Sequence, residues 1–570
     1  MSLTVFTGGT VILEAEREGR THTSDAVAFE GGRVVAVGSE AKQLAEQLAE
    51  RLSDQPAAQI SKPAADRGGA TVIDLAGGTL APGIGEGHAH PVLGGLEAVG
   101  PNVREAADLQ GILDAVAEWK RQHPDAEWIV GASYDATFAP GGVFKTEWLD
   151  AVTGDTPTIL RAWDYHTAWV NSAALAAGGI TAATPDPPLG RYLRDADGTP
   201  IGTLQEAAAN DFIANVVPAF ALADRVAAIE AATRDYAAQG TTWVQDAWVE
   251  PSDIPTYLEA ARTDRLHTRV NLAFRADPAT WREQLAGFVA RRDEIRALGH
   301  DRLSAETVKF FVDGVIESRT AALGAPYADR PGERGLPNWS EDDIAAAATA
   351  FDAAGFQLHI HAIGDDANRI ALDTIEVVNA AGDPGQHGGE RSGQHGGERA
   401  HVIAHVAMLA PADIERFAAL GVIANFEPFW AQCDAVMRDL TIPHIGHDRE
   451  GWQYLIGSVL RSGATVSFGS DWPVTTKDWR PAFSTAVTRH SHLEPDAESW
   501  LPDERVSAGA ALSAYTAGTA KQALAPERGT LRVGMIADAV WLSADPLAVD
   551  PTAVPEIEVL GTWLAGARTH

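Results

Sequence analysis

The chain has 570 residues, with 78 Asp and Glu against 44 Lys and Arg, which gives a formal net charge of −34. This acidity argues against binding to nucleic acid or to an anionic membrane, because both partners need a basic face. Hydrophobic residues make up 45% of the chain, so the composition is that of a globular protein of about two to four domains.

Lysine is scarce, because only seven of the 44 basic residues are Lys. An acidic, Lys-poor chain resembles proteins of salt-loving microbes, whose carboxylate-rich surfaces stay hydrated in high salt. A GC-rich genome combined with an ordinary acidic surface is the alternative explanation. We expect a halophilic protein.

Cys433 is the only cysteine, which excludes a disulfide framework and a cysteine-based zinc site. The first residues carry no signal peptide pattern, and no apolar stretch reaches the ~18 residues of a membrane span. We therefore expect a soluble, cytoplasmic protein. A small-molecule substrate and a homodimer are two further expectations.

Both ends of the chain read as short β segments. Near the start they cover residues 4–13, 26–30, 34–37 and 72–75, separated by Gly-Gly pairs, with a helix and a loop over residues 40–66. Near the end they cover residues 538–542 and 559–564. We predict one small β-sandwich domain, assembled from residues 1–80 and 525–570.

The middle of the chain alternates between apolar β-type runs and Ala-rich amphipathic stretches. The eight runs cover residues 79–90, 241–248, 268–274, 306–312, 356–362, 400–406, 421–426 and 464–469. The amphipathic stretches include residues 278–298, 341–354, 366–381, 411–420 and 449–462. This alternation predicts an α/β fold, a closed (β/α)8 TIM barrel over residues 81–524. Residues 91–240 are too long for one connection, so we predict an insertion after the first barrel strand.

Residues 385–392 (GQHGGERS) are followed at once by residues 393–400 (GQHGGERA), a tandem duplication. Its two histidines make a metal site conceivable. The Gly-rich polar composition instead favours a surface loop that was doubled by replication slippage.

A His-Ala-His sequence stands at the end of the first barrel run. In a strand, residues i and i+2 point to the same side, so the imidazoles of His88 and His90 face one point. Two neutral imidazoles on one face suit Zn²⁺ or a similar metal ion. The pattern also occurs by chance, so it needs support from other strands.

Further polar residues stand at or near the ends of other barrel runs, and these ends converge on one mouth of the barrel. They are Lys309 in the fourth run, His359 and His361 in the fifth, His405 in the sixth and Asp471 after the eighth.

Each of these residues has an ordinary structural explanation on its own. A strand-end histidine is often a satisfied core residue, Lys309 could extend to the surface, and Asp471 could cap a helix. Lys309 is nevertheless one of seven lysines and lies inside an apolar strand, where a lone ammonium is costly. Because five such coincidences would have to meet at one mouth, the set favours a metal site.

The sequence resembles the amidohydrolase superfamily, and within it the amidohydrolase-3 branch, the YtcJ-like group that includes N-substituted formamide deformylase. The matching segments are residues 81–91 (APGIGEGHAHP), 166–175 (HTAWVNSAAL), 308–314 (VKFFVDG), 361–365 (HAIGD), 403–405 (IAH), 468–474 (FGSDWPV) and 529–540 (GTLRVGMIADAV). Two positions depart from the family pattern. Glu86 stands where Asp or Asn is frequent, and Ala404 stands where a Glu often precedes the sixth-strand histidine.

The resemblance implies two divalent ions, expected to be Zn²⁺, with Mn²⁺, Fe²⁺, Co²⁺ and Ni²⁺ as alternatives. It implies that His88 and His90 bind the first ion, with Asp471, and that His361 and His405 bind the second. His359 competes with His361 for this role. Lys309 would be carboxylated on its amine and would bridge both ions. These assignments are what the resemblance implies.

The reaction implied by the resemblance is hydrolysis of a C–N bond in an amide, a cyclic amide or an N-formyl compound by metal-activated hydroxide. Asp471 would move the proton, and His166 would act in the site. A deaminase, an ester or lactone hydrolase and a non-catalytic scaffold on the same barrel are the alternatives. One-metal deaminases generally lack the bridging lysine, so Lys309 argues against that route. Aromatic residues near the strand ends could line a substrate pocket, and we select Trp163, Trp248, Phe429 and Trp472.

Overall fold

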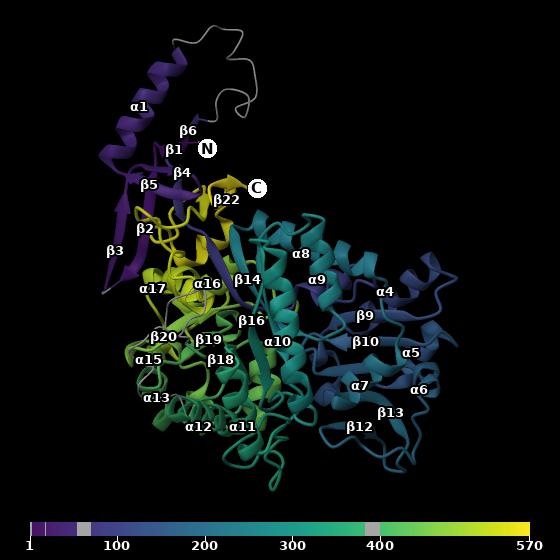
Figure 1. Cartoon of the computed structure of the whole chain (residues 1–570). Coiled ribbons are helices and arrows are strands. Elements are labelled where there is room, and N and C mark those ends of the chain that lie inside the picture. Colours follow the sequence, from purple (N-terminus) through teal and green to yellow (C-terminus); the bar gives the residue numbers. More distant parts are fainter. Residues whose placement is uncertain (1–2, 18, 54–69, 382–399) are drawn as a thin grey trace.

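A computed structural model describes residues 3–17, 19–53, 70–381 and 400–570 (Figure 1). The tandem duplication, apart from Ala400, and the loop expected after residue 53 lie outside the described residues.

The centre of the molecule is a TIM barrel, which confirms the predicted fold class. Its eight strands are parallel and neighbour one another in the order β20-β19-β18-β17-β16-β15-β14-β8. They are β8 (Ile84–Ala89), β14 (Thr241–Val249), β15 (Arg269–Arg275), β16 (Leu303–Phe311), β17 (Gln357–Ala362), β18 (Val402–His405), β19 (Ile423–Phe426) and β20 (Thr465–Phe468).

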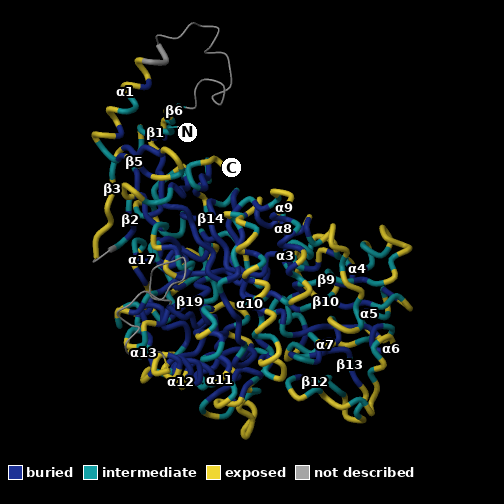
Figure 2. Tube along the Cα trace, viewed as in Figure 1, coloured by how far each residue is buried: buried dark blue, intermediate teal, exposed yellow. Residues whose placement is uncertain are grey.

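Amphipathic helices cover the outside of the barrel, with their polar faces exposed and the strands buried behind them (Figure 2). Helix α11 begins where the sequence provides a cap, because the Ser340 hydroxyl accepts a hydrogen bond from the backbone N–H of Asp343. The covering helices are α8 (Leu222–Ala238), α9 (Ile254–Arg262), α10 (Trp281–Leu298), α11 (Glu341–Ala353), α12 (Asp365–Ala381), α13 (Ile414–Ala419), α15 (Ile456–Arg461), α16 (Trp479–Thr488) and α17 (Ala508–Ser513).

The apolar run at residues 79–90 is two strands rather than one, which corrects the prediction. Strand β7 (Thr79–Pro82) pairs with terminal strands, and β8 starts the barrel after Gly83. A Cβ on Gly83 would lie 2.5 Å from the Thr242 side chain, so the chain can pass there only as glycine. Strands β7 and β8 are both buried throughout, so the sequence shows one continuous run although the structure has two strands.

Both ends of the chain build the β-sandwich. One sheet has the order β5-β4-β1-β6 and the other the order β23-β22-β21-β7-β2-β3. Phe6, Phe29 and Trp563 pack between them, with ring centroids 4.9 Å to 5.0 Å apart. The strands are β1 (Leu3–Thr7), β2 (Thr10–Arg17), β3 (Arg20–Ser24), β4 (Val27–Glu30), β5 (Arg33–Val37), β6 (Ala70–Asp74), β21 (Ala539–Leu542), β22 (Val559–Leu564) and β23 (Ala567–Arg568), and helix α1 (Ser39–Ser53) follows β5.

Residues 91–240 contain a lobe beside the barrel, which lies on the right in Figure 1. Its sheet has the order β12-β13-β11-β10-β9, and two apolar clusters of its own lie on the sheet. After the short helix α3 (Pro91–Glu97), the lobe consists of α4 (Leu109–Gln122), β9 (Ile129–Tyr134), α5 (Thr146–Thr153), β10 (Thr158–Ala162), β11 (Thr167–Val170), α6 (Ser172–Ala177), β12 (Gly190–Arg194), β13 (Pro200–Glu206) and α7 (Ala207–Val216). Helix α8 then leads back into barrel strand β14.

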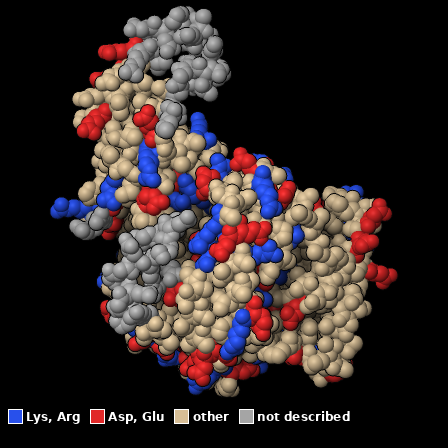
Figure 3. Space-filling view, viewed as in Figure 1, with Lys and Arg blue, Asp and Glu red and all other residues tan. Residues whose placement is uncertain are grey.

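Acidic and basic side chains are interspersed over the face shown in Figure 3. Among the described residues, no helix has both the length and the hydrophobicity that a membrane span requires.

Candidate functional site

The residues singled out at the strand ends lie together at one mouth of the barrel. His88 is near the end of β8 and His90 follows that strand directly. Lys309 is in the last third of β16, His361 is near the end of β17, and His405 ends β18. All five side chains are buried. Residues more than 300 positions apart in the sequence therefore share one centre, as the barrel topology requires.

Asp471 reaches this centre through the seam where the last barrel strand meets the first. Its backbone N–H donates to the carbonyl of His88 (2.7 Å), and the N–H of His90 donates to the carbonyl of Trp472 (2.7 Å). Glu86 holds the same seam, because its carboxylate accepts hydrogen bonds from the N–H groups of His88 (3.1 Å) and Ser470 (2.8 Å). Three of these hydrogen bonds cross the seam, and they fix Asp471 beside the two histidines.

The first cluster of donors surrounds His88. Its Nε2 lies 3.2 Å from the Lys309 Nζ and 3.6 Å from the Asp471 Oδ1. The Nε2 of His90 lies 2.9 Å from the same carboxylate oxygen. His88, His90 and Asp471 can each offer one atom to a common ion, since these atoms lie within 4.8 Å of one another.

His361 and His405 form the other side of the centre, with ring centroids 4.5 Å apart. His405 also lies 4.5 Å from His88 by the same measure. The two candidates in β17 are separated by their surroundings. The Nε2 of His359 lies 2.9 Å from the Nδ1 of His88, whereas His361 lines the cavity described below. This placement favours His361 over His359 as a ligand, but the ligand roles remain predictions.

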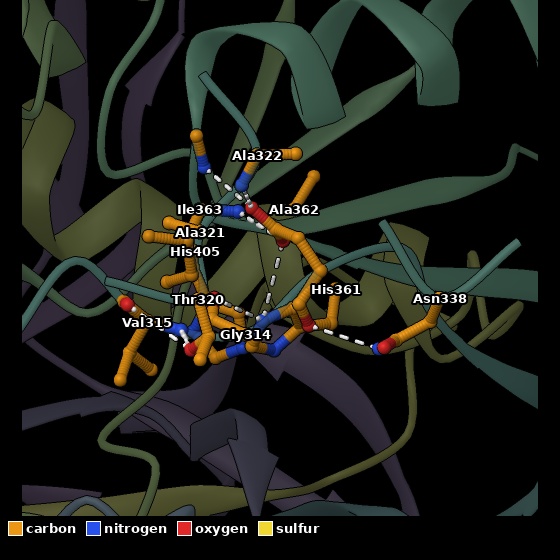
Figure 4. Close-up of polar contacts among 12 residues, drawn as sticks. Gly314, Val315, Thr320, Ala321, Ala322, Asn338, His361, Ala362, Ile363 and His405 are labelled. Carbon is orange, nitrogen blue, oxygen red and sulfur yellow. Dashed lines mark hydrogen bonds and ion pairs between the residues drawn. The ribbon is translucent and has the colours of Figure 1, made fainter. Parts of the chain in front are cut away.

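The loop that follows β16 holds the ring of His361 through a hydrogen bond at Nε2 (Figure 4). The Nε2 of His361 lies 3.3 Å from the carbonyl oxygen of Gly314. Asp313 anchors that loop, because its carboxylate accepts hydrogen bonds from the N–H groups of Ala322, Ile363 and Gly364 at 2.8 Å to 3.0 Å. A carbonyl can only accept, so the proton of His361 lies on Nε2 and its Nδ1 has a free lone pair.

Lys309 is fully buried among the histidines, and its Nζ lies 4.7 Å from the centre of the Phe311 ring. Burial lowers the pKa of Lys309 to about 7, because the charged ammonium loses its hydration. A neutral amine is the form that adds to CO₂, so this environment is compatible with the carboxylated lysine that the sequence predicts.

Two buried carboxylates at the site were missed by the sequence analysis. Glu427 follows β19 and has its Oε2 3.0 Å from the Nδ1 of His405. Asp246 in β14 has its Oδ1 4.0 Å from the Nδ1 of His90 and accepts a hydrogen bond from the Tyr257 hydroxyl. Both could have been found in the sequence, because each is a polar residue within or directly after an apolar barrel run, as His405 is.

The donor set fits divalent metal ions. Burial lowers the pKa of His88, with a further contribution from Lys309, and burial raises the pKa of Asp246 to about 8. Neutral imidazoles are the form that binds metal ions, and a bound cation favours ionised carboxylates. Residues of this kind, buried together, therefore gain a favourable partner when divalent ions bind.

Backbone strain is concentrated at the same place. His405 has φ of +74° and Asp471 has φ of +52°, in the left-handed region that non-glycine residues rarely adopt. Val406, which is β-branched, follows with φ of +47°. Such strain persists where the surrounding structure demands it, and it clusters at functional sites.

A cavity of about 390 Å³ opens onto the centre, and His361, His405 and Asp471 form part of its wall. Trp163 and Phe429 line it, as the sequence suggested, together with Trp430. Trp248 lines a smaller neighbouring cavity. The apolar part of the large cavity also includes Ala136, Val315, Ile316, Ile363, Ala407, Val436, Met437, Leu440 and Val474.

Trp472 departs from that expectation. It is absent from the residues lining either cavity, and its ring packs against Tyr236 with centroids 5.8 Å apart. Gly94 makes room for it, since a Cβ there would lie 2.5 Å from the indole, and the Lys477 Nζ lies 4.2 Å from the ring centre. The indole therefore packs against helices α3 and α8 rather than into either cavity.

His166 lines both cavities and approaches the centre from the lobe, with its ring 5.5 Å from that of His361. Its Nδ1 lies 2.8 Å from the Oε2 of Glu206. Burial opposes protonation, but the charge and hydrogen bond of Glu206 outweigh it and raise the pKa of His166 to about 9. At neutral pH His166 is therefore a cation that can donate from Nε2.

The His166–Glu206 pair predicts a pH-dependent stability. Because the pKa of His166 is raised above the ordinary 6.5, its contribution is complete below pH 6.5 and is lost as the pH rises through about 9. We expect Glu206→Gln to destabilise the metal-free protein by about 1–3 kcal/mol at pH 6. The difference from wild type should shrink between pH 7 and pH 9, measured by thermal unfolding in the presence of a chelator.

An exposed pair provides the control. His447 lies 3.0 Å from Glu450 with its ring in solvent, so His447→Gln should change stability little at any pH. A stability difference for Glu206→Gln that stays constant from pH 6 to pH 9 would contradict the proposed protonation of His166.

The amidohydrolase family model matches residues 71–570. The chain belongs to the amidohydrolase family. This confirms the resemblance seen in the sequence motifs and identifies the chain as a hydrolase. The family is generally dependent on divalent metal ions, in agreement with the donor set described above.

Two curated relatives match almost end to end. The chain is 26% identical over 569 residues to the putative amidohydrolase YtcJ of Bacillus subtilis, covering 99% of this chain and 98% of the relative. It is 27% identical over 574 residues to the N-substituted formamide deformylase of Arthrobacter pascens, covering 97% and 96%. Among solved structures, an uncharacterized metal-dependent hydrolase of Pyrococcus horikoshii superposes with a TM-score of 0.71 at 22% identity, covering 96% of this chain and 99% of that one. This last likeness concerns the fold.

Proposed function

We propose that this amidohydrolase hydrolyses the C–N bond of small amides, cyclic amides or N-formyl compounds with two divalent metal ions. The observation that supports this most is the convergence of four histidines, Lys309 and Asp471 beside a cavity of about 390 Å³. The full-length similarity to an N-substituted formamide deformylase favours this bond type.

In this proposal His88, His90 and Asp471 hold one ion, and His361 and His405 hold the other. Lys309, carboxylated on its amine by CO₂, would supply a carbamate whose oxygens both ions could share. Two Zn²⁺ ions suit the imidazoles best, with Mn²⁺, Fe²⁺, Co²⁺ and Ni²⁺ as alternatives. When bound, such ions lower the pKa of water and polarise a carbonyl oxygen.

The chain's own groups complete the reaction. Asp471 accepts the proton of the attacking water and returns it to the leaving nitrogen, so that the amide and water give a carboxylic acid and an amine. His166 donates a hydrogen bond from Nε2 to the oxygen that becomes negative. The apolar wall, which includes Phe429 and Trp430, excludes water around the substrate.

The charged side chains that line the cavity limit which amides can bind there. Carboxylates of Asp164, Glu317 and Asp434 line it beside Asp471. Its cationic side chains, Arg104 and His166, are both engaged: Arg104 lies 2.8 Å from Glu97 and His166 lies 2.8 Å from Glu206. We therefore propose substrates that are neutral or cationic and apolar, rather than amides bearing a free carboxylate.

The test is hydrolysis of matched amides by metal-loaded enzyme in high salt. Neutral N-formyl and N-acyl amines should have a kcat/KM at least about tenfold above that of analogues of equal size bearing a carboxylate, because like charges repel. Chelation should abolish turnover, and Zn²⁺ should restore it. Turnover that survives complete removal of metal, or a panel in which only esters react, would contradict the proposed function.

One lining carboxylate allows the charge argument to be tested separately. The Glu317 carboxylate accepts a hydrogen bond from the Thr441 hydroxyl, and burial raises the pKa of Glu317. Glu317→Gln should narrow the gap between neutral and anionic substrates, whereas Glu498→Gln on the exposed surface should leave it unchanged. An unchanged gap in Glu317→Gln would show that this carboxylate does not select the substrate.

A further inference from the structure

Glu427 is a fully buried carboxylate in the metal centre, on a barrel strand to which the predicted ligand set assigns nothing. It is the first residue after β19, and its side chain is 0% exposed. Its Oε2 lies 3.0 Å from the Nδ1 of His405, and its Oε1 has no hydrogen-bond partner. Burying a carboxylate with an unsatisfied oxygen is costly, so a structural role alone gives no reason to place one here.

The backbone at His405 is strained. His405 and Val406 both have positive φ, at +74° and +47°. The segment after β19 contacts the ring on two sides: Glu427 lies at Nδ1, and Trp430 stacks on the face with centroids 5.7 Å apart and planes 14° apart. The side chain is therefore fixed from a neighbouring strand.

Which nitrogen of His405 is available depends on Glu427. The Glu427 carboxylate accepts a hydrogen bond from the Nδ1–H of His405, so the lone pair of His405 lies on Nε2. Histidines that bind metal ions generally donate their other N–H to such an oxygen, which fixes the tautomer and makes the binding nitrogen more basic. The opposite side of the centre is constructed in a comparable way, since His361 is held at Nε2 by the Gly314 carbonyl.

We propose that Glu427 is a positioning residue for the second metal ion, acting through His405. This rests on the proposed binuclear centre. Its negative charge also offsets the excess positive charge of the centre, because two divalent ions outweigh one carbamate, Asp471 and one hydroxide by one unit.

The experiment measures binding of Zn²⁺ to wild type and to variants by competition with a chromogenic chelator, together with the visible spectrum of the Co²⁺-loaded protein. Wild type should bind two ions. In Glu427→Ala the affinity for the second ion should fall about 10- to 100-fold while the first ion is retained. Glu427→Gln keeps an acceptor for Nδ1 but not the charge, so it should bind the second ion with intermediate affinity.

Glu504 provides a matched control. It is a buried glutamate outside the site that accepts hydrogen bonds from the N–H (2.8 Å) and the hydroxyl of Ser458. Glu504→Gln tests whether loss of a buried carboxylate changes metal binding through stability alone, and it should leave both affinities unchanged.

The outcomes separate the two proposals. If wild type binds two ions and Glu427→Ala binds both with unchanged affinity, the inference about Glu427 is wrong and the binuclear centre stands. If wild type binds no second ion, both are wrong. A direct bond from a Glu427 oxygen to metal in a loaded crystal would also overturn the positioning role.

Discussion

Asp471→Asn is expected to lower kcat by about 10²- to 10⁴-fold, the usual contribution of a group that transfers a proton in the transition state. The Asp471 carboxylate lies 2.9 Å from His90 and 3.6 Å from His88, so it is placed beside the first proposed ion. Asparagine has nearly the same shape and keeps one oxygen, but it cannot take up a proton. KM should therefore change much less than kcat in steady-state assays of the metal-loaded protein.

The control for this variant is Asp503→Asn, which changes an exposed aspartate and should leave kcat unchanged. Metal content and the thermal midpoint of Asp471→Asn should be measured alongside, because lost activity counts only if the ions and the fold remain. Full activity in a folded, metal-loaded Asp471→Asn protein would mean that another group moves the proton.

Lys309→Ala is expected to remove at least one of the two ions and to lower kcat/KM by more than about 100-fold, the loss typical of disturbed metal coordination. Lys309 is fully buried 3.2 Å from the Nε2 of His88, where an ammonium has no water and a bridging anion would have two cations. Elemental analysis reports the ions, and intact mass under native conditions should show one added CO₂ on wild type.

Two comparisons make the Lys309 experiment specific. Lys521→Ala changes an exposed lysine and should keep both ions and full activity. In Lys309→Ala the missing side chain leaves space beside His88, so a small carboxylate such as acetate should restore part of the metal content. A metal-loaded crystal with an unmodified Lys309 amine would contradict the carboxylation.

Much of the fold was predictable because the barrel strands are buried on both faces and are separated by amphipathic helices. The eight runs and the insertion were visible for that reason, and the family match confirms the assignment made from the motifs. The residues that converge at the mouth were also visible, since a polar side chain at the end of an apolar run stands out. Their roles remain predictions.

The sequence could not predict which distant segments lie side by side in the structure. The break at Gly83 is hidden because strands β7 and β8 are both buried and only one residue separates them, although they belong to different sheets. The roles proposed for Glu206 and Glu427 depend on their contacts with His166 and His405, which lie 40 and 22 positions away in the sequence. The packing of Trp472 against Tyr236 and Gly94, outside both cavities, likewise could not be predicted from its hydrophobicity.

The seam between β20 and β8 has a consequence for the order in which the protein can become active during its synthesis. His88 and His90 leave the ribosome hundreds of residues before Asp471, and the hydrogen bonds that join them cross that interval. A nascent chain that stops short of Asp471 contains the histidines and Lys309, but it lacks the carboxylate that completes the first proposed donor group, and its barrel is not closed. The donor group of His88, His90 and Asp471 is therefore complete only in a nearly complete polypeptide.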